Sequence, residues 1–117
     1  SNPLAAPLRL SIDGDVTRAQ ATYGVVHEGP PGCVHGGVVV AAFDELLAVA
    51  QAATGTAGFT GTLTIRLRKH TPLFRTIDYE AGVDREEGRK IHAWGRSLCG
   101  GEVTAEAEGI FIRSTAT

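Results

Sequence analysis

The longest apolar stretch of the chain runs from Val38 to Ala53, and it contains only three polar residues, Asp44, Glu45 and Gln51. A segment that is apolar on nearly every side over about four turns is typical of a buried central helix. We expect this helix to run from about Gly36 to Ala53 and to end at the glycines that follow it. An ionisable group inside such a helix is costly unless it is paired. We therefore predict a buried, functional Asp44, the alternative being a structural acid bonded to backbone amides or a hydroxyl.

After this segment the apolar period changes to two, which predicts strands over residues 59–69, 76–84, 90–98 and 102–113. A segment rich in Thr, Val and Tyr, residues 16–27, predicts a first strand before the helix. Glu86-Glu87-Gly88 and Gly100-Gly101 have the composition of hairpin turns, so the last three strands should be antiparallel. Five strands and one long helix indicate an α+β fold in which a curved antiparallel sheet wraps the helix.

The length of 117 residues fits one domain. We assign residues 1–15 to an N-terminal extension, residues 16–113 to the domain and residues 114–117 to a tail. Ser1-Asn2 are typical of the remnant of a cleaved expression tag and are left out of this reasoning.

The formal net charge of −2 and the pI near 6.0 argue against nucleic acid or a membrane surface as a partner. Asp44 and Glu45 interrupt the only apolar run that approaches the length of a membrane span. No secretory signal is visible, and two cysteines without a CxxC spacing do not indicate a disulfide framework. We therefore expect a cytoplasmic protein, and we expect no metal and no cofactor.

Local motifs add a family resemblance over residues 16–113. His35-Gly36-Gly37 stand at the start of the helix, and Asp44 follows the histidine by nine residues. With the order of strands, this pattern resembles the hotdog-fold thioesterases, in the branch of the phenylacetyl-CoA thioesterases and the acyl-CoA thioesterase superfamily members. The likeness extends to four further segments: Thr60-x-x-Leu63-x-Ile65, Lys69-x-x-Pro72-Leu73, Glu87-Gly88-Arg89-Lys90 and Ala105-x-Ala107-x-Gly109-x-Phe111.

The resemblance implies hydrolysis of acyl-CoA thioesters to a free acid and CoA. It implies that the Gly36 amide binds the thioester oxygen, that Asp44 is the general base or the nucleophile, and that the Thr60 hydroxyl lies near the attacking water. His35 would orient the loop or contact the substrate. The chemistry agrees, because a helix N-terminus presents unpaired amides to a developing oxyanion, and glycine allows a close approach.

A distance argument predicts the assembly. Gly36 and Asp44 are eight residues apart, or about 12 Å along one helix. A catalytic base and an oxyanion donor must each lie within roughly 3 Å of the reacting atoms. We therefore expect Gly36 of one subunit to act with Asp44 of another, in a homodimer with two equivalent sites. A tetramer remains open.

Several residues are candidates for contacts with the substrate. Gly37 lies beside the oxyanion donor, and the apolar Phe43, Leu47 and Phe59 suggest a tunnel for an acyl or aryl chain, together with Val40. CoA phosphates require cations, and the candidates are Lys69, Arg89, Lys90, Arg66 and Arg68. Such charges are more often solvated strand or turn residues.

Three functional alternatives stay open. The chain could be a non-catalytic acyl-CoA-binding hotdog module, which would keep the glycines without needing Asp44. A hotdog hydratase fits less well, because no Asp/His pair follows the helix in the arrangement that this activity uses. Acyl-carrier-protein thioesters are alternative substrates.

Overall fold

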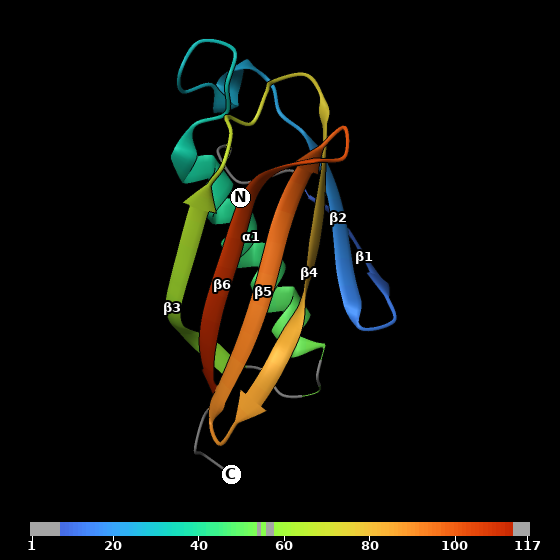
Figure 1. Ribbon diagram of the computed structural model, residues 1–117, viewed down its shortest axis with the longest axis vertical. Coiled ribbons are helices and arrows are strands. Elements are labelled where there is room, and N and C mark those ends of the chain that lie inside the picture. The colour runs from blue at the N-terminus through green and yellow to red at the C-terminus, as the bar shows by residue number, and fades with distance from the viewer. Residues whose placement is uncertain (1–7, 54, 56–57, 114–117) are drawn as a thin grey trace.

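The computed structural model describes residues 8–53, 55 and 58–113. One helix packs against one face of a six-stranded antiparallel sheet, as Figure 1 shows. The helix is α1 (Gly36–Ala52), and a short 3-10 helix, η1 (Val25–His27), precedes it. The strands are β1 (Arg9–Asp13), β2 (Val16–Thr22), β3 (Gly58–Leu67), β4 (Thr76–Glu87), β5 (Lys90–Cys99) and β6 (Glu102–Arg113). The predicted α+β class with one long helix is confirmed.

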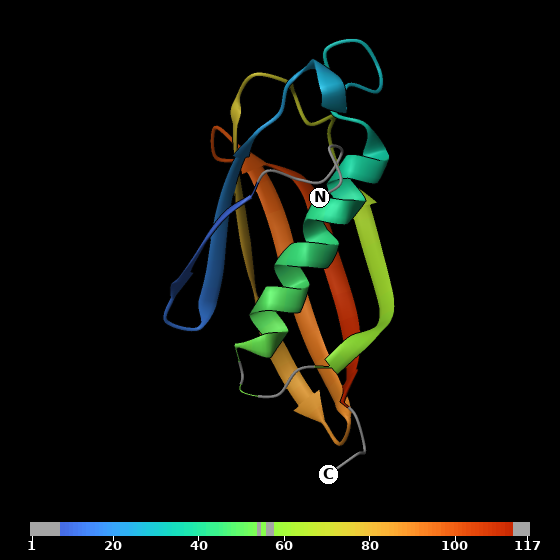
Figure 2. The ribbon, with the colours of Figure 1, turned by 180° about the vertical axis from the view of Figure 1, so that it is seen from behind.

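The strand order is β1-β2-β4-β5-β6-β3, so β3 lies at one edge of the sheet although it follows the helix directly in the chain. Figure 2 shows α1 crossing the sheet face with β3 beside it. No described strand pairs with the outer side of β3. This edge therefore presents unpaired backbone groups next to the helix.

The core lies between α1 and the sheet. Phe43, Leu46 and Leu47 from the helix are fully buried against Ile77, Tyr79, Ile91 and Phe111 of the central strands. Burial of each large apolar side chain contributes roughly 1.5–3 kcal/mol to stability. Gly95 of β5 is required by this packing, because a Cβ there would lie 2.7 Å from Leu47 Cδ1. The helix therefore sits close to the sheet above a strand position without a side chain.

Two predicted boundaries are wrong. The sheet has six strands, not five, because residues 9–13 of the assigned extension form β1, paired with β2. All five residues of β1 are exposed, so its sequence carries no burial pattern. The first strand was predicted over residues 16–27, but the observed strand β2 ends at Thr22. Its pairing with β4 also ends there, at the pair of Thr22 with Thr76. Residues 1–7 of the extension and the tail 114–117 lie outside the described residues.

A side-chain hydrogen bond and a glycine mark the C-terminal end of the helix. At its C-terminal end the buried Gln51 accepts a hydrogen bond from the Gly58 amide (2.9 Å), which ties α1 to the start of β3. Gly55 has a positive φ of 98°, as expected of a glycine just past a helix. Thr54, Thr56 and Ala57 of the same predicted turn lie outside the described residues.

Candidate active site

Asp44 is exposed in this chain, and the prediction that it is buried inside the helix is wrong for the single chain. The exposed positions of α1 follow one stripe that passes through Gly37, Val40, Ala41, Asp44 and Glu45. Valine and alanine occupy two of these five positions, which is why the sequence pattern appears apolar on nearly every side. The carboxylate therefore lies on an apolar surface instead of inside the core.

Thr60 of β3, whose hydroxyl the family resemblance implied to lie near the attacking water, lies next to Asp44. Its Oγ1 donates a long hydrogen bond to Asp44 Oδ1 (3.4 Å). A register shift between Thr60 and Thr62 marks a bulge in β3 at this point. Bulges re-aim side chains and interrupt pairing. The bulge thus coincides with the place where β3 presents a hydroxyl to the helix.

The amides at the start of α1 are almost all engaged within the chain. The His35 amide donates to the His27 carbonyl (2.7 Å), the Gly37 amide donates to His35 Nδ1 (2.8 Å), and the Val38 amide donates to the His35 carbonyl (3.0 Å). The Gly36 amide has no partner among the described residues. A helix start leaves such donors for a ligand or water.

A hollow of about 320 Å³ opens beside this amide. It lies between the helix start and the segment that leaves β3, and its lining includes Gly36, Val39, Leu67, Lys69 and His70. The hollow thus places the unpaired amide beside apolar side chains and beside two cations, Arg68 and Lys69. His70 was not predicted as a lining residue, although its position next to Lys69 in the motif could have indicated it.

The residues predicted to line an acyl tunnel divide into two groups. Phe43 and Leu47 are fully buried and pack over Gly95, on the sheet side of the helix. They fill the space between helix and sheet and do not reach the surface that carries Asp44. Phe59 is 62% exposed beside Thr60, and Val40 is 42% exposed one turn before Asp44. Only Val40 lies on the exposed stripe of the helix that carries the carboxylate, because Phe59 pairs with Ile112 while Thr60 pairs with the buried Phe111, so these neighbouring β3 side chains point to opposite faces of the sheet.

Of the predicted cations, Arg68 and Lys69 both line the hollow beside the helix start, whereas Arg89 and Lys90 lie far from it. Lys69 forms an ion pair with Glu102 near the β5–β6 hairpin. Arg89 and Lys90 lie at the other end of β5, and Arg89 Nε donates to the Arg113 carbonyl (3.2 Å). The length of β5 separates these two groups by about 30 Å.

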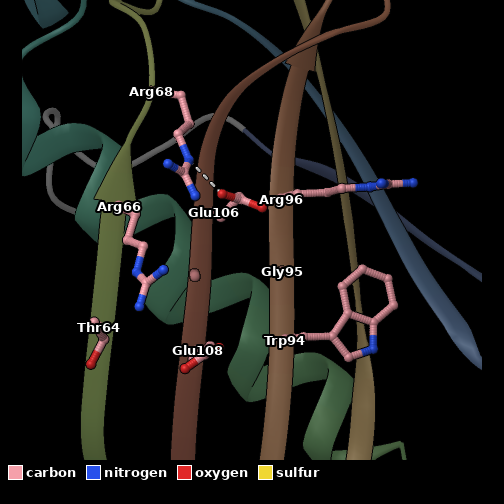
Figure 3. A pocket seen from close by; sticks show the side chains of 9 residues that line it. Thr64, Arg66, Arg68, Trp94, Gly95, Arg96, Glu106 and Glu108 are labelled. Atoms are coloured by element: carbon pink, nitrogen blue, oxygen red, sulfur yellow. Dashed lines mark hydrogen bonds and ion pairs between the residues drawn. The ribbon is translucent and has the colours of Figure 1, made fainter.

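Arg66 and Arg68 face a second hollow, of about 440 Å³, on the sheet surface opposite the helix (Figure 3). Its lining includes both arginine and glutamate side chains. Among them, Arg68 Nε donates a hydrogen bond to Glu106 Oε1 (2.6 Å). Arg96 reaches away from the hollow to Glu80 (2.6 Å). Two of its three arginines are paired with carboxylates, as are Arg68 and Lys69 at the helix start, and the feature that the helix start adds is the unpaired Gly36 amide.

A buried polar pair joins Tyr23, which follows β2, to Tyr79 of β4. The hydroxyls of Tyr23 and Tyr79 share a hydrogen bond of 2.7 Å inside the core. Burial raises the pKa of both tyrosines, and the Glu45 carboxylate adds to the rise at Tyr23. Both phenols therefore stay neutral and act as structural donors and acceptors.

Within the described part of the chain, no three His, Cys, Asp or Glu side chains lie together as metal ligands would. None of its helices combines the length and the apolar character that crossing a membrane requires.

Comparisons with known proteins agree with this geometry. Over 88 residues, which are 74% of the chain, it is 30% identical to human acyl-coenzyme A thioesterase THEM5, of which the match spans 36%. The crystal structure of the thioesterase superfamily protein RHA08564 matches with a TM-score of 0.87 and 35% identity, over 91% of this chain and 56% of that one. The chain thus spans about a third and about half of these two relatives. No family model matches the chain.

A more distant structure shows the same fold. Protein smu.793 from Streptococcus mutans UA159, solved bound to acetyl CoA, matches with a TM-score of 0.85 at 14% identity, over 92% of this chain and 88% of that one. The arrangement of one long helix on an antiparallel sheet agrees with the fold of these structures. The two matches at 30% and 35% identity add agreement in sequence. By its fold and its sequence, this chain is a hotdog domain of the thioesterase superfamily.

Proposed function

We propose that the protein hydrolyses acyl-CoA thioesters to a free acid and CoA. The single observation that carries this proposal is the exposed stripe of α1, which has an unpaired Gly36 amide at its start and the Asp44 carboxylate two turns further on. These are the two groups that acyl transfer to water needs, a donor for the oxyanion and an acceptor for the proton. The matched thioesterases support the same reaction class.

The chemistry can follow either of two courses. In the first, the Asp44 carboxylate takes a proton from water while the water oxygen attacks the thioester carbon, and the Gly36 amide binds the carbonyl oxygen as it becomes negative. The carbon–sulfur bond then breaks, and the proton goes to the CoA thiolate. In the second, Asp44 attacks directly, CoA leaves, and water hydrolyses the resulting mixed anhydride. In both courses the Thr60 hydroxyl orients Asp44 or the water.

We propose further that each site is shared between two subunits. The Gly36 amide and the Asp44 carboxylate of one helix are about 12 Å apart, too far for one thioester carbonyl to contact both groups. Val40 of the helix and Leu67 of β3, exposed by 42% and 61%, lie along the open edge of β3 beside these groups. A second copy on this surface would cover the apolar residues and bring its own Asp44 toward Gly36.

Mixing two inactive variants tests the shared site. Asp44→Asn removes the acid, and Gly36→Val blocks the approach to the amide. A mixed dimer keeps one site in which both groups are intact, so an equal mixture should recover about a quarter of wild-type activity. Each variant alone should stay inactive. No recovery after subunit exchange, verified by mass spectrometry, would contradict the shared site.

The reaction is tested with aromatic, short, medium and long acyl-CoAs and detection of free thiol. Asp44→Asn should lower kcat by at least about 100-fold and leave the affinity for acyl-CoA nearly unchanged. Glu45→Gln, the neighbouring carboxylate on the same stripe, is the matched control and should retain activity. Binding of acyl-CoA without thiol release from any substrate would favour a non-catalytic binding module.

A further inference from the structure

The two glycines at the start of the helix differ in their surroundings. A Cβ on Gly37 would lie 3.1 Å from His35 Nδ1 and 3.2 Å from His35 Cε1, both closer than ordinary contacts. A Cβ on Gly36 would meet nothing within 4 Å. Gly37 therefore makes room for the His35 ring, whereas nothing within the described chain requires glycine at position 36.

The His35 ring also determines which amide is unpaired. A helix start leaves four backbone donors without helical partners. Three of them are satisfied here, and two of those bond to His35 itself, one to its carbonyl and one to ring nitrogen Nδ1. The Gly36 amide, which lies between the bonded amides of His35 and Gly37 in the sequence, is the remaining donor.

We infer that His35 is a positioning residue, which takes the Gly37 amide through Nδ1 and so holds the first turn with only the Gly36 amide directed at a ligand. Its role as oxyanion positioner rests on the proposed thioesterase function. Since Nδ1 accepts a hydrogen bond, the neutral ring carries its proton on Nε2. The ring acts as a side-chain cap at the position where Ser, Asp and Asn are preferred.

The surrounding turn holds this cap in place. The His35 amide is bonded to His27, and a Cβ on Gly29 would lie 2.8 Å from His35 Cα. The Gly29–Cys33 turn, which is closed by the hydrogen bond from the Gly29 amide to the Cys33 carbonyl (2.9 Å), packs against the His35 backbone. The backbone of the histidine is thus held by the His27 carbonyl and by the close approach of Gly29.

Amide hydrogen exchange measured by NMR tests the cap without reference to any substrate. In the wild-type protein the Gly37 amide should exchange at least about tenfold more slowly than the Gly36 amide. Equal exchange at the two glycines would overturn the inference. This result is independent of turnover, so failure of the cap and failure of the proposed reaction can be told apart.

Two substitutions separate positioning from direct contact with substrate. His35→Ala should remove the protection of Gly37 and lower kcat by about five- to tenfold, with a smaller change in KM. His35→Asn, which keeps an acceptor at the cap, should restore both protection and kcat. If Asn restores the protection of Gly37 but leaves kcat as low as in the alanine variant, His35 contacts the substrate directly and the positioning role is refuted.

Discussion

The hydroxyl of Thr60 donates to the carboxylate of Asp44 across 3.4 Å, joining an edge strand to the exposed stripe of the helix. The two residues are 16 positions apart, and the bulge at Thr60 lies on the edge strand β3, whose outer side pairs with no described strand. The contact therefore occurs where helix, strand edge and exposed apolar residues meet. This is the surface on which a second subunit would complete the proposed site.

The Thr60 hydroxyl can be removed without changing the shape of its side chain. Thr60→Val should lower kcat by about tenfold, because the carboxylate or its water loses an orienting partner. Thr60→Ser keeps the hydroxyl and should stay within about threefold of wild type. Steady-state kinetics on one acyl-CoA measure both. Equal activity of the two variants would argue against a role for the hydroxyl.

Gly36→Ala should separate activity from stability. The added methyl meets nothing within 4 Å in the chain, and alanine is the better helix former, so the melting temperature should be unchanged or slightly raised. The methyl would stand where the thioester approaches the amide, and kcat/KM should fall by about tenfold or more. Calorimetry and kinetics on the same preparation check this. A fully active alanine variant would show that the ligand does not approach closely here.

Gly95→Ala should destabilise the fold by about 1–3 kcal/mol, since its Cβ would lie 2.7 Å from Leu47 Cδ1 and overpack the core. Gly24→Ala is the matched control, because a Cβ there meets nothing within 4 Å and its φ of −111° is accessible to alanine. Urea unfolding measures both free energies. Similar values for the two variants would mean that helix and sheet can separate at little cost.

Acid should weaken the fold partly through Glu80. Hydrogen bonds from Arg96 and Arg18 lower the pKa of this carboxyl from its ordinary value of 4.5. A lowered folded-state pKa means that the stabilisation is present above pH 4.5 and is lost as the pH falls through the folded pKa. Glu80→Gln should therefore be less stable than wild type at pH 7, with the difference shrinking in acid.

Unfolding curves between pH 7 and pH 3 test this linkage. Glu108→Gln is the control, since Glu108 lies on the same sheet surface and makes no ion pair among the described residues. It should follow the wild-type pH dependence. Parallel curves for wild type and Glu80→Gln would contradict the role given to the arginines.

Much of the fold and of the candidate site could be predicted from local patterns. The change of apolar period from helical to two-fold located α1 and the four strands after it to within a few residues. Gly100-Gly101 form the hairpin turn expected, with φ of 60° and 84°. The His35-Gly36-Gly37 motif marked the first turn of the helix, because glycine and a capping side chain are local signals.

Only the tertiary structure decided which side of each element is covered. Asp44 looked buried because valine and alanine surround it in the sequence, yet the sheet covers one side of α1 and leaves the other open. Strand β1 was missed because an edge strand exposed on both faces needs only a neighbour's hydrogen bonds, which no periodicity reports. Hydrogen bonds between near neighbours in the chain are determined by the local sequence, whereas burial and the pairing of distant residues depend on the packing of the whole domain.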